Sequence, residues 1–254
     1  MAKPSKLSKS AKTDRQRLIE ETLKKQRSAE KRRGNVIIMS AVLVAVVILA
    51  IAAGPILLGR FQEQAYADDP VDQIGAEPAV CQQVIEKEGT DVGTHVEQPQ
   101  EVTYDAAPPA FGAHWNVAGV APATFDEKFY DENDRPPLEA LVHNLEHGYT
   151  ILWYDETIAD DSDKLAQIRA IARKFKESDD NQNFRNKFIA APWLESDEEG
   201  ATFPEGQHVA FTHWKGDTTN STGVWQYCSE VSGEALLQFM DKYPYTDAPE
   251  AAIP

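Results

Sequence analysis

Hydrophobic and polar residues alternate in blocks along the chain, and the longest apolar block lies near its beginning. No charged residue occurs between Gly34 and Gly59, and Val, Ile, Leu and Ala make up most of this run. A helix rising about 1.5 Å per residue needs about 20 apolar residues to cross a bilayer. The pattern therefore predicts a transmembrane helix over residues 35–59, a basic cytoplasmic arm over residues 1–34 and a linker over residues 60–80.

The charges that flank this predicted helix indicate its orientation. Lys31, Arg32 and Arg33 precede the apolar run, whereas Arg60 stands alone after it. The positive-inside rule then predicts a single-pass protein of the cell membrane, with the N-terminus inside and the C-terminal domain outside the cytoplasm. Ala67 ends a small-x-small sequence that resembles a cleavage site, but the basic arm and the apolar run are both longer than in a signal peptide, which favours an uncleaved anchor.

Beyond the linker, residues 81–254 show patterns that are typical of both helices and strands. Apolar spacing predicts helices that begin at Asp134, Ser162 and Ser232, each of which is a good N-cap residue. Runs rich in β-branched and aromatic residues predict strands over residues 149–154, 187–191, 208–214 and 223–228. This order predicts a single extracytoplasmic α+β domain with a mixed sheet flanked by helices, preceded by the transmembrane helix. Residues 93–115 are expected to form a loop.

Charge is distributed unevenly between the arm and the rest of the chain. The 254 residues carry 25 Lys and Arg against 41 Asp and Glu, a net charge of −16. Residues 1–34 hold 12 basic and 4 acidic residues, a net of +8, which leaves −24 for residues 35–254. A nucleic-acid-binding surface must be basic to neutralise phosphates, so the acidic part argues against a DNA or RNA partner. A hydrophobic content of 42% argues against a disordered chain.

The chain contains two cysteines, Cys81 and Cys228. In an oxidising compartment two such cysteines usually pair, and a bridge over so long a loop stabilises by about 4–5 kcal/mol in the chain-entropy model. The expected disulfide ties the start of the outer domain to its last strand. The sequence has no Cys-x-x-Cys, so it gives no support to a role in thiol–disulfide exchange.

The sharpest local motif is His143-x-x-Glu146-His147, at the end of the predicted helix before Gly148. Helical spacing predicts that both imidazoles and the carboxylate share a face away from the apolar stripe. Two histidines four residues apart can bind one metal ion, and this order also matches the inverted zinc-peptidase pattern. The alternative is structural, because histidines in the last turn of a helix are favoured by its dipole.

Three stretches together resemble the bacterial domain of unknown function 3105 family. They contain Thr94-His95-Val96, then Pro108-Pro109-Ala110-Phe111-Gly112-Ala113-His114, then Val142-His143-Asn144-Leu145-Glu146-His147-Gly148. Phe111 stands where the family pattern has Ser. The resemblance implies a short cytoplasmic arm, one membrane span and an extracytoplasmic domain, and it groups His95 and His114 with His143 and His147. It implies no particular reaction.

We therefore expect a membrane-anchored protein that binds zinc or copper through a histidine cluster, with no catalytic residue assigned. Four imidazoles and a carboxylate suit zinc or copper(II), whereas Met240 is the only methionine of the outer part, so a methionine-rich copper(I) site is not indicated. The candidate ligands are His143, His147, His114, His95 and Glu146. Two alternatives remain: a non-catalytic cell-envelope module with structural histidines and a protein partner, and a metal-dependent hydrolase.

Overall fold

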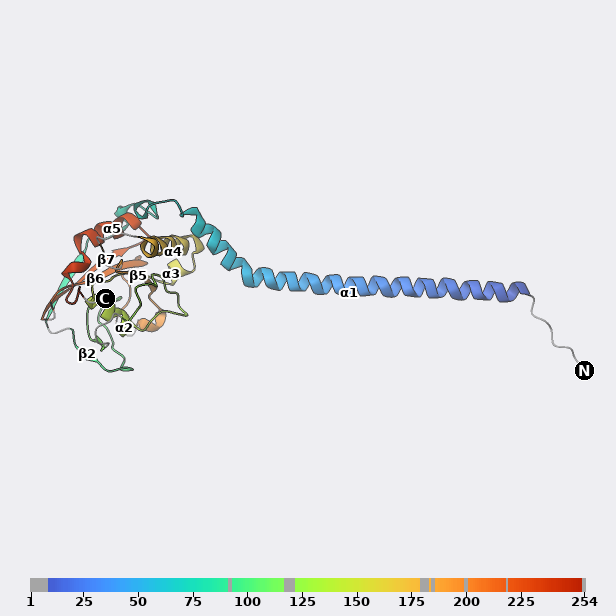
Figure 1. Ribbon diagram of the computed structural model, residues 1–254, viewed down its shortest axis with the longest axis horizontal. Coiled ribbons are helices and arrows are strands. Elements are labelled where there is room, and N and C mark those ends of the chain that lie inside the picture. Colours follow the sequence, from blue (N-terminus) through green and yellow to red (C-terminus); the bar gives the residue numbers. More distant parts are fainter. Residues whose placement is uncertain are drawn as a thin grey trace, which may run out of the picture. The chain divides into compact units, whose positions relative to one another are not determined.

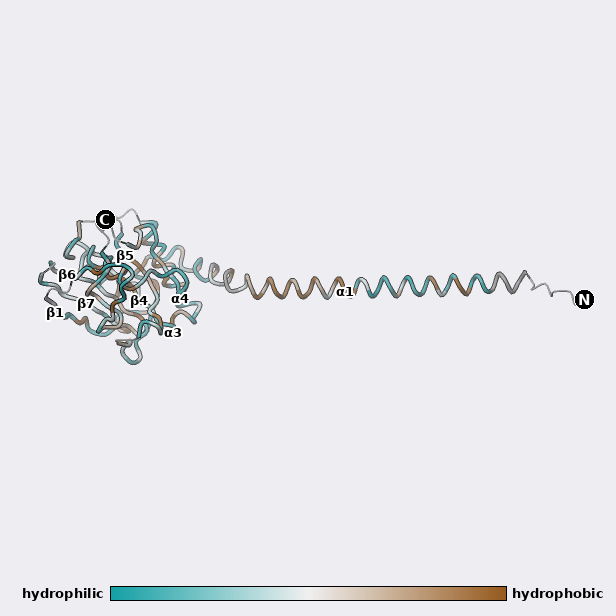
Figure 2. The backbone as a smooth tube through the Cα atoms, turned by 90° about the horizontal axis from the view of Figure 1, so that it is seen from below, coloured by the Kyte–Doolittle hydropathy of each residue, from teal (hydrophilic) through white to brown (hydrophobic). Residues whose placement is uncertain are grey.

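The computed structural model of the chain describes residues 9–90, 93–116, 122–178, 183, 186–198, 201–217 and 219–252. The chain divides into two compact units, Met1–Leu58 and Gly59–Pro254. Helix α1, Lys9–Ala65, contains the apolar run, and Figure 2 shows that run as a hydrophobic stretch preceded by more hydrophilic turns. Among the described residues, α1 is the one helix whose length and composition suit a membrane span or a signal sequence.

The second unit is built on a five-stranded sheet with the order β1-β7-β6-β4-β5. Strand β4 pairs with β5 in parallel, and the other neighbours are antiparallel. The α+β class with a mixed sheet is thus confirmed. The strands are β1 (Ile85–Thr90), β4 (Thr150–Tyr154), β5 (Phe188–Pro192), β6 (Val209–Gly216) and β7 (Asn220–Cys228).

The parallel pair requires a crossover connection, which passes through helices α3 (Glu156–Ala159) and α4 (Ser162–Glu177). Asp155 caps α3 by accepting from the main-chain N of Ile158. The cap of α4 is Asp161, one residue before the predicted Ser162. Helix α5 (Gly233–Lys242) begins as predicted, with the Ser232 side chain accepting from the main-chain N of Ala235.

Successive residues of each strand point to opposite faces of the sheet, and this alternation separates two cores. Helices α4 and α5 cover one face, and α2 (Leu138–Glu146) covers the other (Figure 1). On the α4/α5 face lie Leu152, Tyr154, Phe188, Phe211 and Phe239. On the α2 face lie Leu141, Leu145, Ile151, Trp153 and Trp214.

The segment before β1 packs on the α4/α5 face. Ile74 is 1% exposed there, between the 3₁₀ turns η1 (Val71–Gln73) and η2 (Pro78–Val80). Cys81 and Cys228 form a disulfide with an S–S distance of 2.04 Å. Because Cys228 ends β7, the bridge fixes this segment to the sheet.

Three local predictions were wrong or incomplete. The chain forms an edge strand, β1, that the sequence did not predict, and the expected loop contains β2 (His95–Val96) paired in parallel with β3 (His114–Trp115). Helix α2 begins at Leu138 rather than after Asp134, with Pro137 as its N-cap residue. Asp134 instead accepts from the main-chain N of Asp131 in the preceding turn.

Candidate metal centre

Helix α2 supplies two of the candidate ligands, His143 and Glu146, which are three residues apart and so lie on one side of the helix. The helix ends at Glu146, with His147 as its C-cap residue, and Gly148 follows with φ +91°. A Cβ on Gly148 would lie 2.4 Å from the carbonyl oxygen of Tyr245, so only glycine allows this close approach.

The short β2–β3 pair supplies the other two ligands. Its register places His95 directly beside His114, although 18 residues separate them in the sequence. The main-chain N of His114 donates to the carbonyl of Thr94 at 3.0 Å, which fixes this pairing. The pair lies against α2, so it covers the polar side of that helix.

The helical spacing predicted a polar face away from the apolar stripe, and the β2–β3 pair buries this face as well, since every residue of α2 except Leu138 is buried. His114 and His147 are 0% exposed, and His143 and Glu146 are 2% exposed. His95 remains partly open, with a side chain 40% exposed. A ligand would thus reach the group past His95.

His95, His114, His143 and Glu146 form what we call the histidine–glutamate cluster. One ligand atom from each lies within 4.8 Å of the others. Glu146 Oε2 lies 3.0 Å from His114 Nε2 and 3.5 Å from His95 Nε2. Ligand atoms on a tetrahedral zinc, with bonds of about 2.0–2.1 Å, lie about 3.3 Å apart, so both separations fit two ligands of one ion.

The outer ring nitrogens of two histidines are held by main-chain carbonyls. His114 Nδ1 lies 2.8 Å from the oxygen of Gly112, and His143 Nδ1 lies 2.6 Å from the oxygen of Trp115. A carbonyl oxygen only accepts, so each Nδ1 carries its proton and donates. The Nε2 atoms then face the cluster. Metal-binding histidines are commonly oriented by such a hydrogen bond on the other nitrogen.

The electrostatics of two members of the cluster, His143 and Glu146, favour the forms that bind a metal. Burial lowers the pKa of His143 to about 4, although its hydrogen bond to Trp115 works in the opposite direction. Burial alone would raise the pKa of Glu146, but the hydrogen bond from His114 and the charges of the surrounding imidazoles outweigh it and hold this pKa below its usual value. At neutral pH the cluster therefore contains a neutral His143 and an ionised Glu146.

His147 lies beside the cluster but groups with a different acid. Its Nε2 is 2.9 Å from His143 Nε2 and 3.4 Å from Glu250 Oε2. Glu146, His147 and Glu250 form a second group of possible ligands, with ligand atoms within 4.8 Å of one another. Burial raises the pKa of Glu250, and the charge of Glu146 raises it further. Glu250 was not predicted as a candidate ligand, because one glutamate beyond the last helix carries no motif.

The remaining two histidines lie outside both groups. His208 Nδ1 lies 2.8 Å from an oxygen of Asp155, and His213 Nε2 lies 2.7 Å from an oxygen of Asp247. Each therefore has an acidic partner of its own. His208 is therefore a suitable control for substitutions in the cluster.

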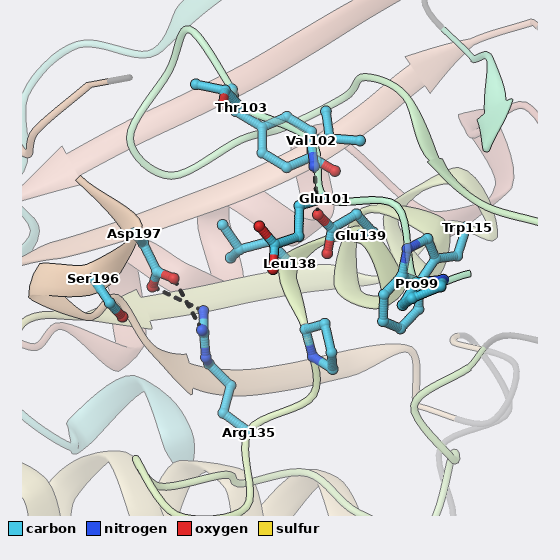
Figure 3. A pocket seen from close by; sticks show the side chains of 12 residues that line it. Pro99, Glu101, Val102, Thr103, Trp115, Arg135, Leu138, Glu139, Ser196 and Asp197 are labelled. Carbon is cyan, nitrogen blue, oxygen red and sulfur yellow. Dashed lines mark hydrogen bonds and ion pairs between the residues drawn. The ribbon is translucent and has the colours of Figure 1, made fainter. Parts of the chain in front are cut away.

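A pocket of about 430 Å³ opens at the beginning of α2, where Leu138 and Glu139 line it (Figure 3). The Arg135 guanidinium pairs with both carboxylate oxygens of Asp197 at 2.9 and 3.0 Å, and Glu139 accepts from the main-chain N of Val102 (Figure 3). Trp115 lines the pocket, but none of the four residues of the cluster does. Pocket and cluster are thus separate features that share α2 and Trp115.

The fold and this cluster define an α+β domain in which one carboxylate and three imidazoles from α2, β2 and β3 converge. A model of a family described as proteins of unknown function, DUF3105, matches residues 95–254, more than half of the chain. The chain belongs to this family, and the resemblance found in the sequence is confirmed. Neither the curated proteins nor the solved structures contain a match.

Proposed function

We propose that the chain is a membrane-anchored extracytoplasmic protein that binds a transition-metal ion, zinc or copper(II), through His95, His114, His143 and Glu146. The observation that carries this proposal is the convergence of four ligand atoms, from the β2–β3 pair and α2, within 4.8 Å of one another. Three of the four residues are at most 2% exposed. Burying such groups is costly unless they are paired or coordinate a metal.

The chemistry of the ligand set favours a metal ion of intermediate softness, such as zinc or copper(II). Imidazole suits zinc, copper and iron, and one carboxylate completes a site with four protein ligands. The oriented Nδ1 atoms of His114 and His143 reduce the reorganisation that binding requires. With four protein ligands the set has the composition of a closed site, whereas a catalytic zinc site keeps one position open for water. We therefore propose metal binding rather than hydrolysis.

The proposed location rests on two features. Helix α1 has the length and composition of a membrane span, and Cys81–Cys228 is a disulfide of the kind that persists in oxidising compartments. With basic residues before the apolar run, the positive-inside rule places the N-terminus in the cytoplasm. The domain boundaries that we propose are a basic arm over 1–34, a span over 35–59, a linker over 60–80 and the extracytoplasmic domain over 81–254.

Elemental analysis of the untagged full chain, purified in detergent and dialysed after loading with zinc or copper(II), tests this function. We expect tightly held metal in the natural sequence and a lower metal content per chain in His114→Ala/His143→Ala. His208→Ala, a histidine outside the cluster, should bind like the natural sequence.

Two results would contradict the proposal. The first is a natural chain that retains neither metal, and the second is equally tight binding in the double variant. A double variant that loses thermal stability in the presence of chelator, with no metal in either protein, would favour structural histidines. Capture of an envelope partner would then be the next experiment.

A further inference from the structure

The end of α2 contributes to the second group of possible ligands, which consists of Glu146, His147 and Glu250. Only Glu146 also belongs to the histidine–glutamate cluster. His147 is fully buried, and the side chain of Glu250 is 30% exposed. Glu250 Oε2 lies 3.4 Å from His147 Nε2. This group therefore combines an imidazole and two carboxylates, which are ligands that divalent transition metals accept.

The position of Glu250 is set by the fold around it. Its main-chain N donates to the carbonyl of Glu146 at 2.9 Å, so the two glutamates are joined directly through the backbone. Lys187 Nζ donates to the carbonyls of His147, at 2.5 Å, and Ala251, at 2.8 Å, and so connects the end of α2 to the same segment. The three ligands are thus held together without any contribution from an ion.

The segment that carries Glu250 is also fixed one turn earlier. Asp247, at the end of the 3₁₀ turn η4 (Tyr245–Asp247), pairs with the buried His213 at 2.7 Å. The carbonyl of Tyr245 occupies the space beside Gly148 that a side chain would fill. Residues 245–251 therefore lie against the end of α2, and Glu250 faces His147 from this segment.

The charges of the second group also favour a cation. Glu146 and Glu250 bring two carboxylates within 4.8 Å of each other, and like charges at such a distance repel. A carboxylate has two oxygens, so Glu146 can accept from the cluster and still reach a second ion. His143 Nε2 and His147 Nε2 are 2.9 Å apart, which places the two groups in contact.

We propose that Glu146, His147 and Glu250 hold a second divalent transition-metal ion next to the first, and that Glu146 is shared between the two. This inference rests on the proposed function, because Glu146 is also a ligand of the first ion. His147, which the sequence motif placed with His143 in one site, is here assigned to the second ion.

Zinc stoichiometry of the full chain in detergent tests this second position. We expect two tightly held zinc ions per chain for the natural sequence and one for Glu250→Gln. Gln has the shape of Glu and keeps the main-chain contact of residue 250 with Glu146, so the fold should be retained, as circular dichroism would verify. Glu205→Gln, the same change at an exposed glutamate in the 201–217 region, is the matched control and should hold two.

Each outcome separates the two proposals. One zinc ion in the natural chain that Glu250→Gln also keeps, or two in Glu250→Gln, would overturn the second position and leave the first intact. A single ion that Glu250→Gln loses would overturn the first. No zinc in the natural chain would overturn both. Two ions in the natural chain and one in Glu250→Gln would support both proposals. In the natural chain, a chelator should then remove the second ion faster than the first.

Discussion

The two faces of the central sheet carry different kinds of core. The face under α4 and α5 is packed with large apolar side chains such as Phe188, Phe211 and Phe239. The face under α2 has an apolar core as well, but it continues into buried ionisable groups that include His143 and Glu146. The comparison indicates that one face mainly stabilises the domain, and the other bears the chemistry that we propose.

The cost of burying ionisable groups explains why the α2 face is built differently. An unpaired buried polar group destabilises the fold, and an unpaired charge does so more strongly. Here β2, β3 and the 245–251 segment supply partners, including the carbonyls of Gly112 and Trp115. Asn144 on α2 adds another link, since its side chain both accepts from and donates to the main chain of Ala123. On this face, short strands and loop segments therefore supply partners to the buried polar groups of α2.

The largest expected effect lies on the α4/α5 face. Replacing Cys81 and Cys228 by Ala opens a loop with a sequence separation of 147. The chain-entropy model predicts a loss of about 5 kcal/mol in the free energy of unfolding, which chemical denaturation of the oxidised and variant proteins would measure. At denaturant concentrations below the midpoint of unfolding, the variant should bind as much zinc per chain as the natural protein. A folded variant that no longer binds zinc would contradict the assignment of stability to one face and metal binding to the other.

A smaller effect is expected from acid on the α2 face. Burial holds the pKa of His143 at about 4 in the folded protein, against 6.5 for the unperturbed group. The unfolded chain therefore binds more protons between these values, and the stability of the metal-free protein should fall as the pH is lowered from about 6.5 to about 4. The shift corresponds to about 3 kcal/mol. The lowered pKa of Glu146 acts with the same sign, because folding favours the deprotonated form of Glu146 as it does that of His143.

Denaturation of the chelator-treated protein at several pH values would measure this dependence. His143→Asn should flatten the pH dependence between pH 6.5 and 4, and His208→Asn, at a histidine paired with Asp155, should keep it. An identical slope in natural and His143→Asn proteins would contradict the assigned origin of the effect.

The elements that the sequence predicted well are those with strong periodicity. Strands β4 to β7 and helices α4 and α5 follow apolar patterns that burial on the sheet requires. Strand β1 was missed because its sequence, Ile-Glu-Lys-Glu-Gly-Thr, has no apolar alternation. This edge strand needs none, because residues 85–88 are exposed rather than packed against a core, and charges at a sheet edge discourage aggregation.

The candidate site was predicted in part, and the missing part depends on tertiary contacts. Helical spacing alone placed His143 and Glu146 together, and the family resemblance added His95 and His114. Nothing in the sequence indicated that β2 and β3 would cover the polar side of α2, because two-residue strands have no pattern of their own. The approach of Glu250 to His147 depends on the packing of residues 245–251, which local sequence does not encode.

The central claim is that the histidine–glutamate cluster binds a metal ion, and anomalous diffraction from zinc-loaded crystals tests it most directly. The account predicts an anomalous peak at the zinc edge about 2.0–2.1 Å from the Nε2 atoms of His114 and His143. Peaks confined to surface residues such as His208, or none in crystals that diffract well after zinc loading, would contradict it.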